Sequence, residues 1–270
     1  MRTLFYRLLV ILFLTAIGAA VGYGASYSQT EKWKVTAQLE QPAVPDLGNY
    51  YSLLSTYTFL NTNNQEANLQ KDVVAEVYAE FKRNLTSADL LQNYLTQTEA
   101  VKLKAQLENK SATMMASQLA TQFSFEKDSA VSADTFSLIS ENPEEAQKLL
   151  NEFILLANLQ AREKLNADLI AKWKVLFQQI KAAAELNLGA KQSANDWNAK
   201  LQMMRSVQPL DNVLTTYRLV KSPSIPLNPV SPDRWFWLMI GALSGLVIGF
   251  ILSFAVKARK SQLVQQVETL

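Results

Sequence analysis

The stretch WFWLMIGALSGLVIGFILSFAV, residues 235–256, decides the fold of this chain of 270 residues. It contains no charged residue, and a second uncharged stretch, LLVILFLTAIGAAVGYGAS, occupies residues 8–26. A helix needs about 20 apolar residues to cross a hydrocarbon core of ~30 Å. Both stretches therefore predict transmembrane helices, and they leave residues 27–234 as the domain between them.

The charges that flank these two helices predict which side of the membrane each end of the chain faces. Two arginines precede the first helix, and three basic residues follow the second one within residues 257–260. Basic residues close to a membrane helix favour the cytoplasmic side. We therefore expect residues 1–7 and 257–270 to be cytoplasmic and residues 27–234 to lie outside.

The first stretch has a second interpretation, a cleaved secretory signal peptide. Arg2 and Arg7 resemble the positive start of such a signal, and the small residues 24–26 offer a cleavage site. The uncharged stretch is long for the apolar part of a signal peptide, which favours a retained helix. A cleaved chain would begin near Ser26.

Composition excludes several classes of function. The chain has no cysteine, which excludes disulfides and cysteine nucleophiles, and no histidine, the commonest general base and neutral metal ligand. Its 26 basic and 24 acidic residues nearly balance, so nucleic-acid binding is not expected. We expect no metal, no cofactor and no catalytic residue. The catalytic alternative is a membrane-tethered glycan hydrolase with a carboxylate pair assembled in space.

The domain between the membrane helices is predicted to be mostly helical, because it contains only two of the eight glycines, Gly48 and Gly189. The longest predicted helix covers about residues 143–188, with Pro143 at its first position and Gly189 after its end. At 1.5 Å per residue it would be about 69 Å long, so we expect an arm that extends from a globular base. Nearly every position over residues 149–159 is apolar, which predicts burial nearly all round there.

Shorter segments predict a small sheet at the base. Residues 32–39 alternate apolar with polar side chains, as a half-buried strand does. Further strands are predicted over 123–126, 131–139 and 213–221, and helices over 53–60, 71–83 and 87–107. The predicted fold class is α+β: two transmembrane helices flank a domain with a small mixed sheet as its base and a long extended α-helical arm.

Four prolines at every third position precede the second membrane helix: Pro223, Pro226, Pro229 and Pro232. Polyproline II has three residues per turn, so this spacing predicts one extended rod over residues 223–232. Such a rod serves as a stiff spacer or as a docking edge for another protein.

Glycines at four-residue intervals mark one face of each membrane helix. Gly18 and Gly22 lie in the first helix, and Gly241, Gly245 and Gly249 lie in the second. Small residues at this spacing let two helix backbones approach closely. We expect these glycines to pack membrane helices together, either within one chain or between subunits.

In their order along the chain, these elements resemble the Wzz-type polysaccharide co-polymerases, the chain-length determinants of lipopolysaccharide O-antigen and related glycans. The resemblance rests on KWKVTAQLEQPAVPDLGNYYSL at residues 32–53, on FSLISENPEEAQKLLNEFILLAN at residues 136–158, and on the proline-rich segment that enters the glycine-rich helix.

The resemblance implies a two-pass protein of the Gram-negative inner membrane with a periplasmic α/β base and a helical arm. It implies ring-like homo-oligomers that control how many repeat units a Wzy-type polymerase adds, and contact with an undecaprenyl-linked glycan. It does not imply an enzyme. The sequence GxxxxGK[ST] occurs nowhere, so the nucleotide-binding activity of kinase-linked relatives is not expected.

Two further interpretations share the two-helix plan. A capsule-polysaccharide export component would block export when deleted, whereas a co-polymerase would alter glycan length. A periplasmic sensor needs a cytoplasmic signalling module, for which the fourteen residues after Val256 leave no room.

Overall fold

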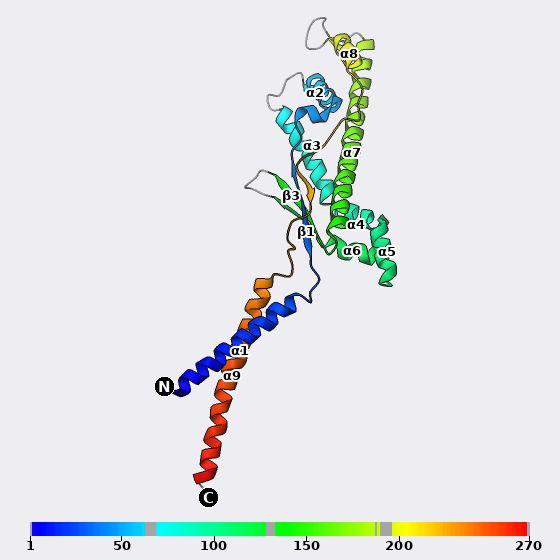
Figure 1. Ribbon diagram of the computed structural model, residues 1–270. Helices are drawn as coiled ribbons and strands as arrows, with labels where there is room; N and C mark the ends of the chain where they lie inside the picture. Colours follow the sequence, from blue (N-terminus) through cyan, green and yellow to red (C-terminus); the bar gives the residue numbers. More distant parts are fainter. Residues whose placement is uncertain (1, 63–68, 128–132, 187, 190–195, 269–270) are drawn as a thin grey trace. The chain divides into compact units, whose positions relative to one another are not determined.

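The structure is a computed structural model that describes residues 2–62, 69–127, 133–186, 188–189 and 196–268 (Figure 1). It divides into two compact units, which we describe separately. The terminal unit comprises residues 1–34, 140–143 and 226–270. The central unit comprises residues 35–139 and 144–225.

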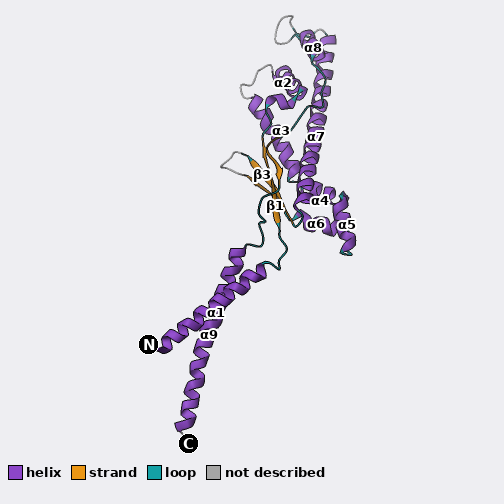
Figure 2. Cartoon of the chain, viewed as in Figure 1, coloured by secondary structure: helices purple, strands orange, loops and turns teal. Residues whose placement is uncertain are grey.

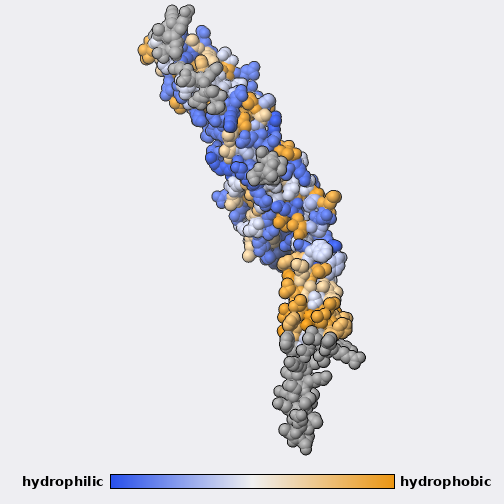
Figure 3. Space-filling model, turned by 90° about the vertical axis from the view of Figure 1, so that its left-hand side faces the viewer, coloured by the Kyte–Doolittle hydropathy of each residue, from blue (hydrophilic) through white to orange (hydrophobic). Residues whose placement is uncertain are grey.

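The terminal unit is built from two long helices, α1 (Arg2–Ser26) and α9 (Arg234–Glu268). Each contains a span that is long and apolar enough to cross a membrane, Leu8–Ser26 and Arg234–Ser253. Only 6% and 11% of these spans are buried within the chain, and apolar surface gathers over this helix pair in Figure 3. A core helix of a water-soluble protein would instead be mostly covered, so the exposure favours a lipid environment.

The described residues of the central unit form a small sheet, drawn in orange in Figure 2. Its four strands are β1 (Trp33–Glu40), β2 (Phe123–Lys127), β3 (Asp134–Ser140) and β4 (Arg218–Ser224), in the order β2-β3-β1-β4. The pairs β1–β4 and β2–β3 are antiparallel. In β1 the buried side chains alternate with partly exposed ones, as the sequence predicts.

Strand β4 begins five residues later than the sequence predicts. Over residues 213–217 the backbone has other hydrogen-bond partners: the amide of Thr215 donates to the carbonyl oxygen of Asp46, and the amide of Thr216 donates to the side-chain oxygen of Asn158. Because these donors are already satisfied, this β-branched segment lies against the core without joining the sheet. The prediction of a strand from residue 213 is therefore wrong at its start.

The described part of the central unit also contains seven shorter helices. They are η1 (Val44–Leu47), α2 (Asn49–Thr62), α3 (Leu69–Leu85), α4 (Ala88–Gln97), α5 (Glu99–Leu107), α6 (Ala112–Ala120) and α8 (Trp197–Ser206). The predicted helix over 87–107 is divided at Thr98, whose backbone is extended and whose hydroxyl donates to the carbonyl oxygen of Leu95. The extended backbone at Thr98 breaks the run of helical hydrogen bonds, so α4 ends there and α5 begins at the next residue.

The long helix α7 (Pro143–Glu185) connects three hydrophobic clusters of the central unit. At its start Leu150 and Phe153 pack with the sheet and with α4 to α6; farther along, Leu165 and Leu169 pack with α2 and α3; near its end Ile180 packs with α8. Its 43 residues correspond to about 64 Å. The predicted α+β fold with a small sheet and a long helical arm is confirmed, although the helix ends three residues earlier than predicted.

Candidate functional site

All five of the glycines singled out in the sequence lie where α1 crosses α9 within one chain. A Cβ atom added at Gly18 would lie 2.9 Å from the Cα atom of Gly245 and closer still to the carbonyl oxygen of Gly241. One added at Gly22 would lie 2.9 Å from the Cα atom of Gly241, and one at Gly249 would meet helix α1 at 3.0 Å. At Gly18, Gly22, Gly241 and Gly245 the two backbones are in direct contact, which leaves no room for a side chain, whereas a Cβ atom at Gly249 needs a shift of only a few tenths of an ångström. We call this contact the glycine seam.

The seam is confined to one face of each helix. Gly24 lies in α1, only two residues beyond Gly22, yet a Cβ atom added there would meet nothing within 4 Å. Glycine is frequent in membrane helices in general. The contrast shows that close packing requires a glycine at position 22 but not at position 24. The sequence left open whether these helices meet within one chain, and the structure places the contact there.

Beyond the seam, polar and aromatic side chains join the segment that follows α1 to the start of α9. The guanidinium group of Arg234 lies 4.7 Å from the ring centre of Tyr27 and 3.8 Å from the carboxylate of Glu31. Asp233 caps the start of α9 by accepting a hydrogen bond from the amide of Trp235 at 3.0 Å. Both Tyr27 and Trp235 are exposed, as aromatic side chains at a membrane interface are.

The four prolines do not form the single rod that their spacing predicts. Pro223 belongs to strand β4, whereas Pro226 and Pro229 lie in a bent segment outside any helix or strand. The peptide bond between Ser231 and Pro232 is cis. The prediction of one polyproline II rod over 223–232 is therefore wrong.

Backbone pairing with β1 explains the bend. Ser224 pairs with Thr36, and Ser231 forms a bridge with Lys32 through a hydrogen bond of 2.8 Å from the Lys32 amide. Ser224 and Ser231 are seven residues apart in the proline-rich segment, but their partners Thr36 and Lys32 are only four residues apart. The proline-rich segment therefore cannot run fully extended between these two pairings and has to bend. Leu227 lies in this bent segment and is almost fully exposed.

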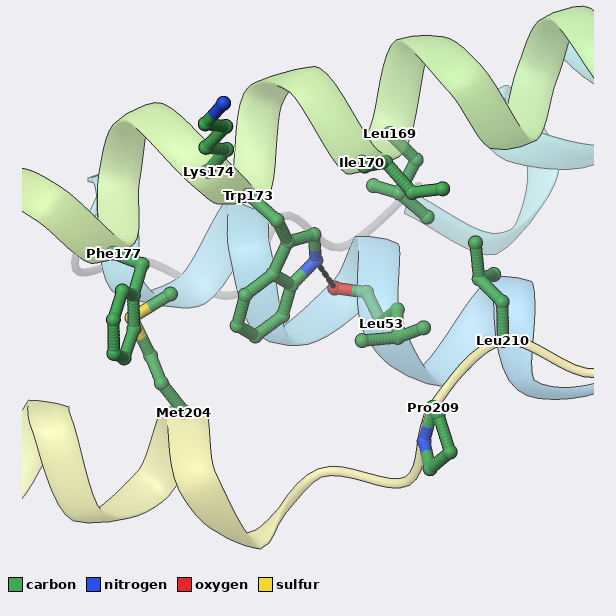
Figure 4. Close-up of a pocket in the computed structure, with 9 residues that line it drawn as sticks. All are labelled: Leu53, Leu169, Ile170, Trp173, Lys174, Phe177, Met204, Pro209 and Leu210. Carbon is green, nitrogen blue, oxygen red and sulfur yellow. Dashed lines mark hydrogen bonds between the residues drawn. The ribbon is translucent and has the colours of Figure 1, made fainter.

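An apolar groove of about 630 Å³ lies in the central unit, between α2, α7 and α8 (Figure 4). Ile170, Trp173 and Phe177 of α7 form one wall, opposite Leu53 of α2 and Met204 of α8. The indole nitrogen of Trp173 donates to the carbonyl oxygen of Leu53 at 3.3 Å, so the polar atom of this ring is already satisfied. With few polar groups to bind sugar hydroxyls, the groove suits an apolar occupant.

A stripe of uncovered apolar side chains on α7 leads into this groove. Leu155, Leu159 and Ile170 are exposed, and together with the groove residues Trp173 and Phe177 they recur at intervals of whole helical turns. The predicted burial nearly all round over residues 149–159 is therefore wrong at Leu155 and Leu159. We call these five residues the α7 stripe.

The buried acidic side chains of the central unit are paired with cations or hydroxyl groups. Glu80 lies 2.6 Å from Arg83 and 3.1 Å from Lys164, and Asp134 accepts a hydrogen bond of 2.8 Å from the hydroxyl of Tyr78. Burial, and then this hydrogen bond, raise the pKa of Tyr78, so it stays a neutral donor. Within the described residues, no group of three acidic side chains is placed to hold a metal ion.

Comparison with solved structures identifies the class of this fold. The chain is similar to a full-length bacterial polysaccharide co-polymerase, with a TM-score of 0.61 at 16% identity and coverage of 96% of each chain. It is also similar to a fragment of WzzB, a polysaccharide co-polymerase from Salmonella Typhimurium, with a TM-score of 0.52 at 18% identity, over 75% of this chain and all of the fragment. The fold is that of the polysaccharide co-polymerases.

Sequence comparison identifies the family. Residues 1–98 match the family model Wzz, described as chain length determinant protein. A relative from Salmonella typhimurium, the ECA polysaccharide chain length modulation protein, is 27% identical over 316 aligned positions, which cover 92% of this chain and 90% of the relative. The resemblance to the Wzz-type polysaccharide co-polymerases that the sequence indicates is confirmed.

Proposed function

We propose that this protein sets the chain length of a bacterial surface polysaccharide and does so without catalysing a reaction. The observation that carries the proposal is the alignment of 92% of the chain with a relative that is named for modulating ECA polysaccharide length. The composition supports the non-catalytic part, because the chain has neither histidine nor cysteine. The name of that relative favours the ECA polysaccharide over O-antigen as the glycan.

The proposed location is the inner membrane of a Gram-negative cell, with both termini in the cytoplasm and the central unit in the periplasm. The basic residues that flank α1 and α9 support this orientation. The proposed partners are a Wzy-type polymerase and the undecaprenyl-linked glycan that it extends.

The proposed mechanism depends on shape. The glycine seam fixes α1 and α9 against each other, and the α7 stripe with its groove provides an apolar face for a neighbouring copy. A ring forms when such a face meets a different face of the next subunit and the rotation closes. The assembled α7 helices then present a repeated surface to the polymerase or to the glycan, and this surface determines when elongation stops.

Deletion of the gene tests the proposed function. We expect ECA polysaccharide of unregulated length in the deletion strain, restored by the intact gene on a plasmid, with glycan length read from electrophoretic ladders. The O-antigen ladder of the same strains is the comparison. A change in the O-antigen ladder alone would indicate that O-antigen, and not the ECA polysaccharide, is the glycan whose length this protein regulates. Unchanged ladders for both glycans would contradict the proposal, and retention of glycan inside the cell would instead indicate an export component.

Retention of α1 is the first prediction. Cleavage near Ser26 would remove Gly18 and Gly22 and leave Gly241 and Gly245 without the backbone against which they pack. We therefore expect the purified protein to keep residues 1–26 and to show the mass of the whole chain, 30.2 kDa, by intact mass spectrometry. A mature amino terminus at or near Ser26 would contradict it.

Disruption of the α7 stripe is the second prediction. Ile170 is 57% exposed, and we expect Ile170→Glu to dissociate the oligomer, because a carboxylate would be buried without a partner in the interface. Val175→Glu is the matched control: Val175 is β-branched and 56% exposed, but it lies about 140° away around α7. The measurement is the mass of the detergent-extracted assembly by light scattering. Equal masses for the two variants would show that the stripe is not the subunit interface.

A further inference from the structure

The helices α5 and α6 form a hairpin whose tip exposes large apolar side chains. Glu108 ends α5, Asn109 adopts a left-handed backbone conformation with φ of 51°, and Ser111 caps α6 by accepting a hydrogen bond from the amide of Met114. Leu107 is 85% exposed, and Leu103, one turn earlier in α5, and Met114, in the first turn of α6, are also exposed. We call these three residues the hairpin tip.

Packing of the hairpin does not account for these side chains. The opposite face of α5 carries Val101 and Ala105, which are buried in the cluster that includes the first turns of α7. Leu103 and Leu107 lie four residues apart on the face that points away from this cluster, so both sides of α5 are apolar and only one is covered. Exposed apolar patches of this kind mark sites of interaction.

The charge around the hairpin tip indicates what covers it. Lys102 and Lys104 lie on either side of Leu103 in α5, and Lys110 lies in the turn, where it forms an ion pair of 2.7 Å with Glu108. Exposed leucine and methionine flanked by lysines favour the surface of an anionic bilayer, where the apolar groups enter the acyl region and the ammonium groups meet phosphate.

The position of the hairpin within the central unit favours the same partner. Val101 and Ala105 of α5 and Met115 of α6 share a core cluster with Val35, near the start of β1, and with Ala146, near the start of α7. Figure 1 shows the hairpin beside the first turns of α7, and the amide of Ile139, four residues before α7, donates to the carbonyl oxygen of Gln122, two residues after α6. Only residues 27–32 separate β1 from the apolar helix α1. The chain therefore holds the central unit close to the bilayer that α1 spans. A tether of this kind makes a weak surface affinity sufficient.

We propose that the hairpin tip formed by Leu103, Leu107 and Met114 inserts into the surface of an anionic phospholipid bilayer, with Lys102 and Lys104 bound to lipid phosphate. This contact gives the central unit an attachment to the membrane in addition to the two chain connections to α1 and α9. The bilayer surface thereby restrains the direction in which the central unit points.

Depth-dependent quenching in the full chain tests this proposal. The protein has no cysteine, so Leu107→Cys provides a single site for an environment-sensitive fluorophore. Leu186→Cys is the control, because Leu186 is 71% exposed and follows the far end of α7. Each labelled protein is placed in nanodiscs of phosphatidylglycerol or of phosphatidylcholine, with and without brominated acyl chains, and the cysteine-free nanodisc scaffold is the only other protein present.

We expect brominated phosphatidylglycerol to quench the label at residue 107 and to leave the label at residue 186 unchanged. Charge reversal of Lys102→Glu together with Lys104→Glu is expected to abolish this quenching. Equal quenching at the two positions, or equal quenching in the two lipids, would overturn the proposal. A blue shift at residue 107 without lipid quenching would also overturn it, because it would assign the tip to a second copy of the chain.

Discussion

Leucine at position 241 is expected to separate α1 from α9 and to abolish the control of glycan length. The added side chain would enter the space occupied by the backbone of Gly18 and by the Cα atom of Gly22, which lies 2.9 Å from the Cβ position. Backbone atoms cannot rotate away as the end of a side chain can, so the helices themselves must move. Because the two backbones meet at Gly18, Gly22 and Gly241, we expect the Gly241→Leu strain to show the unregulated ladder of the deletion strain.

A matched variant and a direct structural measurement make this prediction specific. Gly24→Leu introduces the same side chain into the same helix pair, but at a position with nothing within 4 Å, and we expect normal glycan length. Separation of the helices is measured by oxidising the pair Leu14→Cys and Gly249→Cys, whose Cβ atoms would lie 3.5 Å apart. This is within the usual disulfide range of about 3.5–4.5 Å.

The disulfide between these two cysteines is expected to form in the otherwise unchanged chain and in the Gly24→Leu variant, and to fail with Gly241→Leu. A normal glycan ladder with Gly241→Leu, despite loss of the cross-link, would show that close contact of the two helices is not needed for function. Retention of the cross-link would show that the seam tolerates a side chain.

Removal of the ring of Phe153 is expected to destabilise the central unit more than removal of any exposed aromatic side chain. Phe153 is fully buried in the first third of α7, and its ring centre lies 5.5 Å from that of Tyr94, 5.9 Å from that of Phe136 and 6.2 Å from that of Phe123. Replacement by alanine leaves a cavity among these rings, and such changes cost about 3–5 kcal/mol.

The measurement is thermal unfolding of the detergent-solubilised full chain, followed by the fluorescence of its tryptophans. Phe59→Ala is the control, because Phe59 lies in α2 with 39% of its surface exposed, and we expect a much smaller fall in the unfolding temperature. Equal effects of the two substitutions would contradict the central role of the cluster around Phe153.

Features of this fold that depend on local sequence could be predicted, and α7 is the clearest of them. Pro143 at its first position and the scarcity of glycine afterwards are local signals, and the helix begins at Pro143 as expected. The short helices α6 and α8 also had local signals, the capping residues Ser111 and Asp196, but their apolar periodicity extends over too few residues to identify them. Short helices depend on their caps, so a search for caps could have found them.

Features that depend on pairing between distant segments could not be predicted. The proline-rich segment bends because Ser224 and Ser231 bind to residues about two hundred positions away, which three-residue spacing does not reveal. The groove combines Leu53, Trp173 and Met204, each on a different helix. Apolar periodicity likewise could not distinguish the exposed Leu155 from the buried Ile154 beside it, because the direction of the core is set by the tertiary fold.

The division of α7 among successive clusters has a consequence for evolution. The cluster around Phe153 shares no side chain with the one around Ile180. Insertions or deletions near the second of these clusters can therefore change the reach of the helix while the sheet keeps its packing. Steps of seven or eleven residues nearly preserve the angular phase of a helix. Related proteins can thus differ in the length of this helix by gaining or losing helical turns near Ile180, while the packing around Phe153 stays the same.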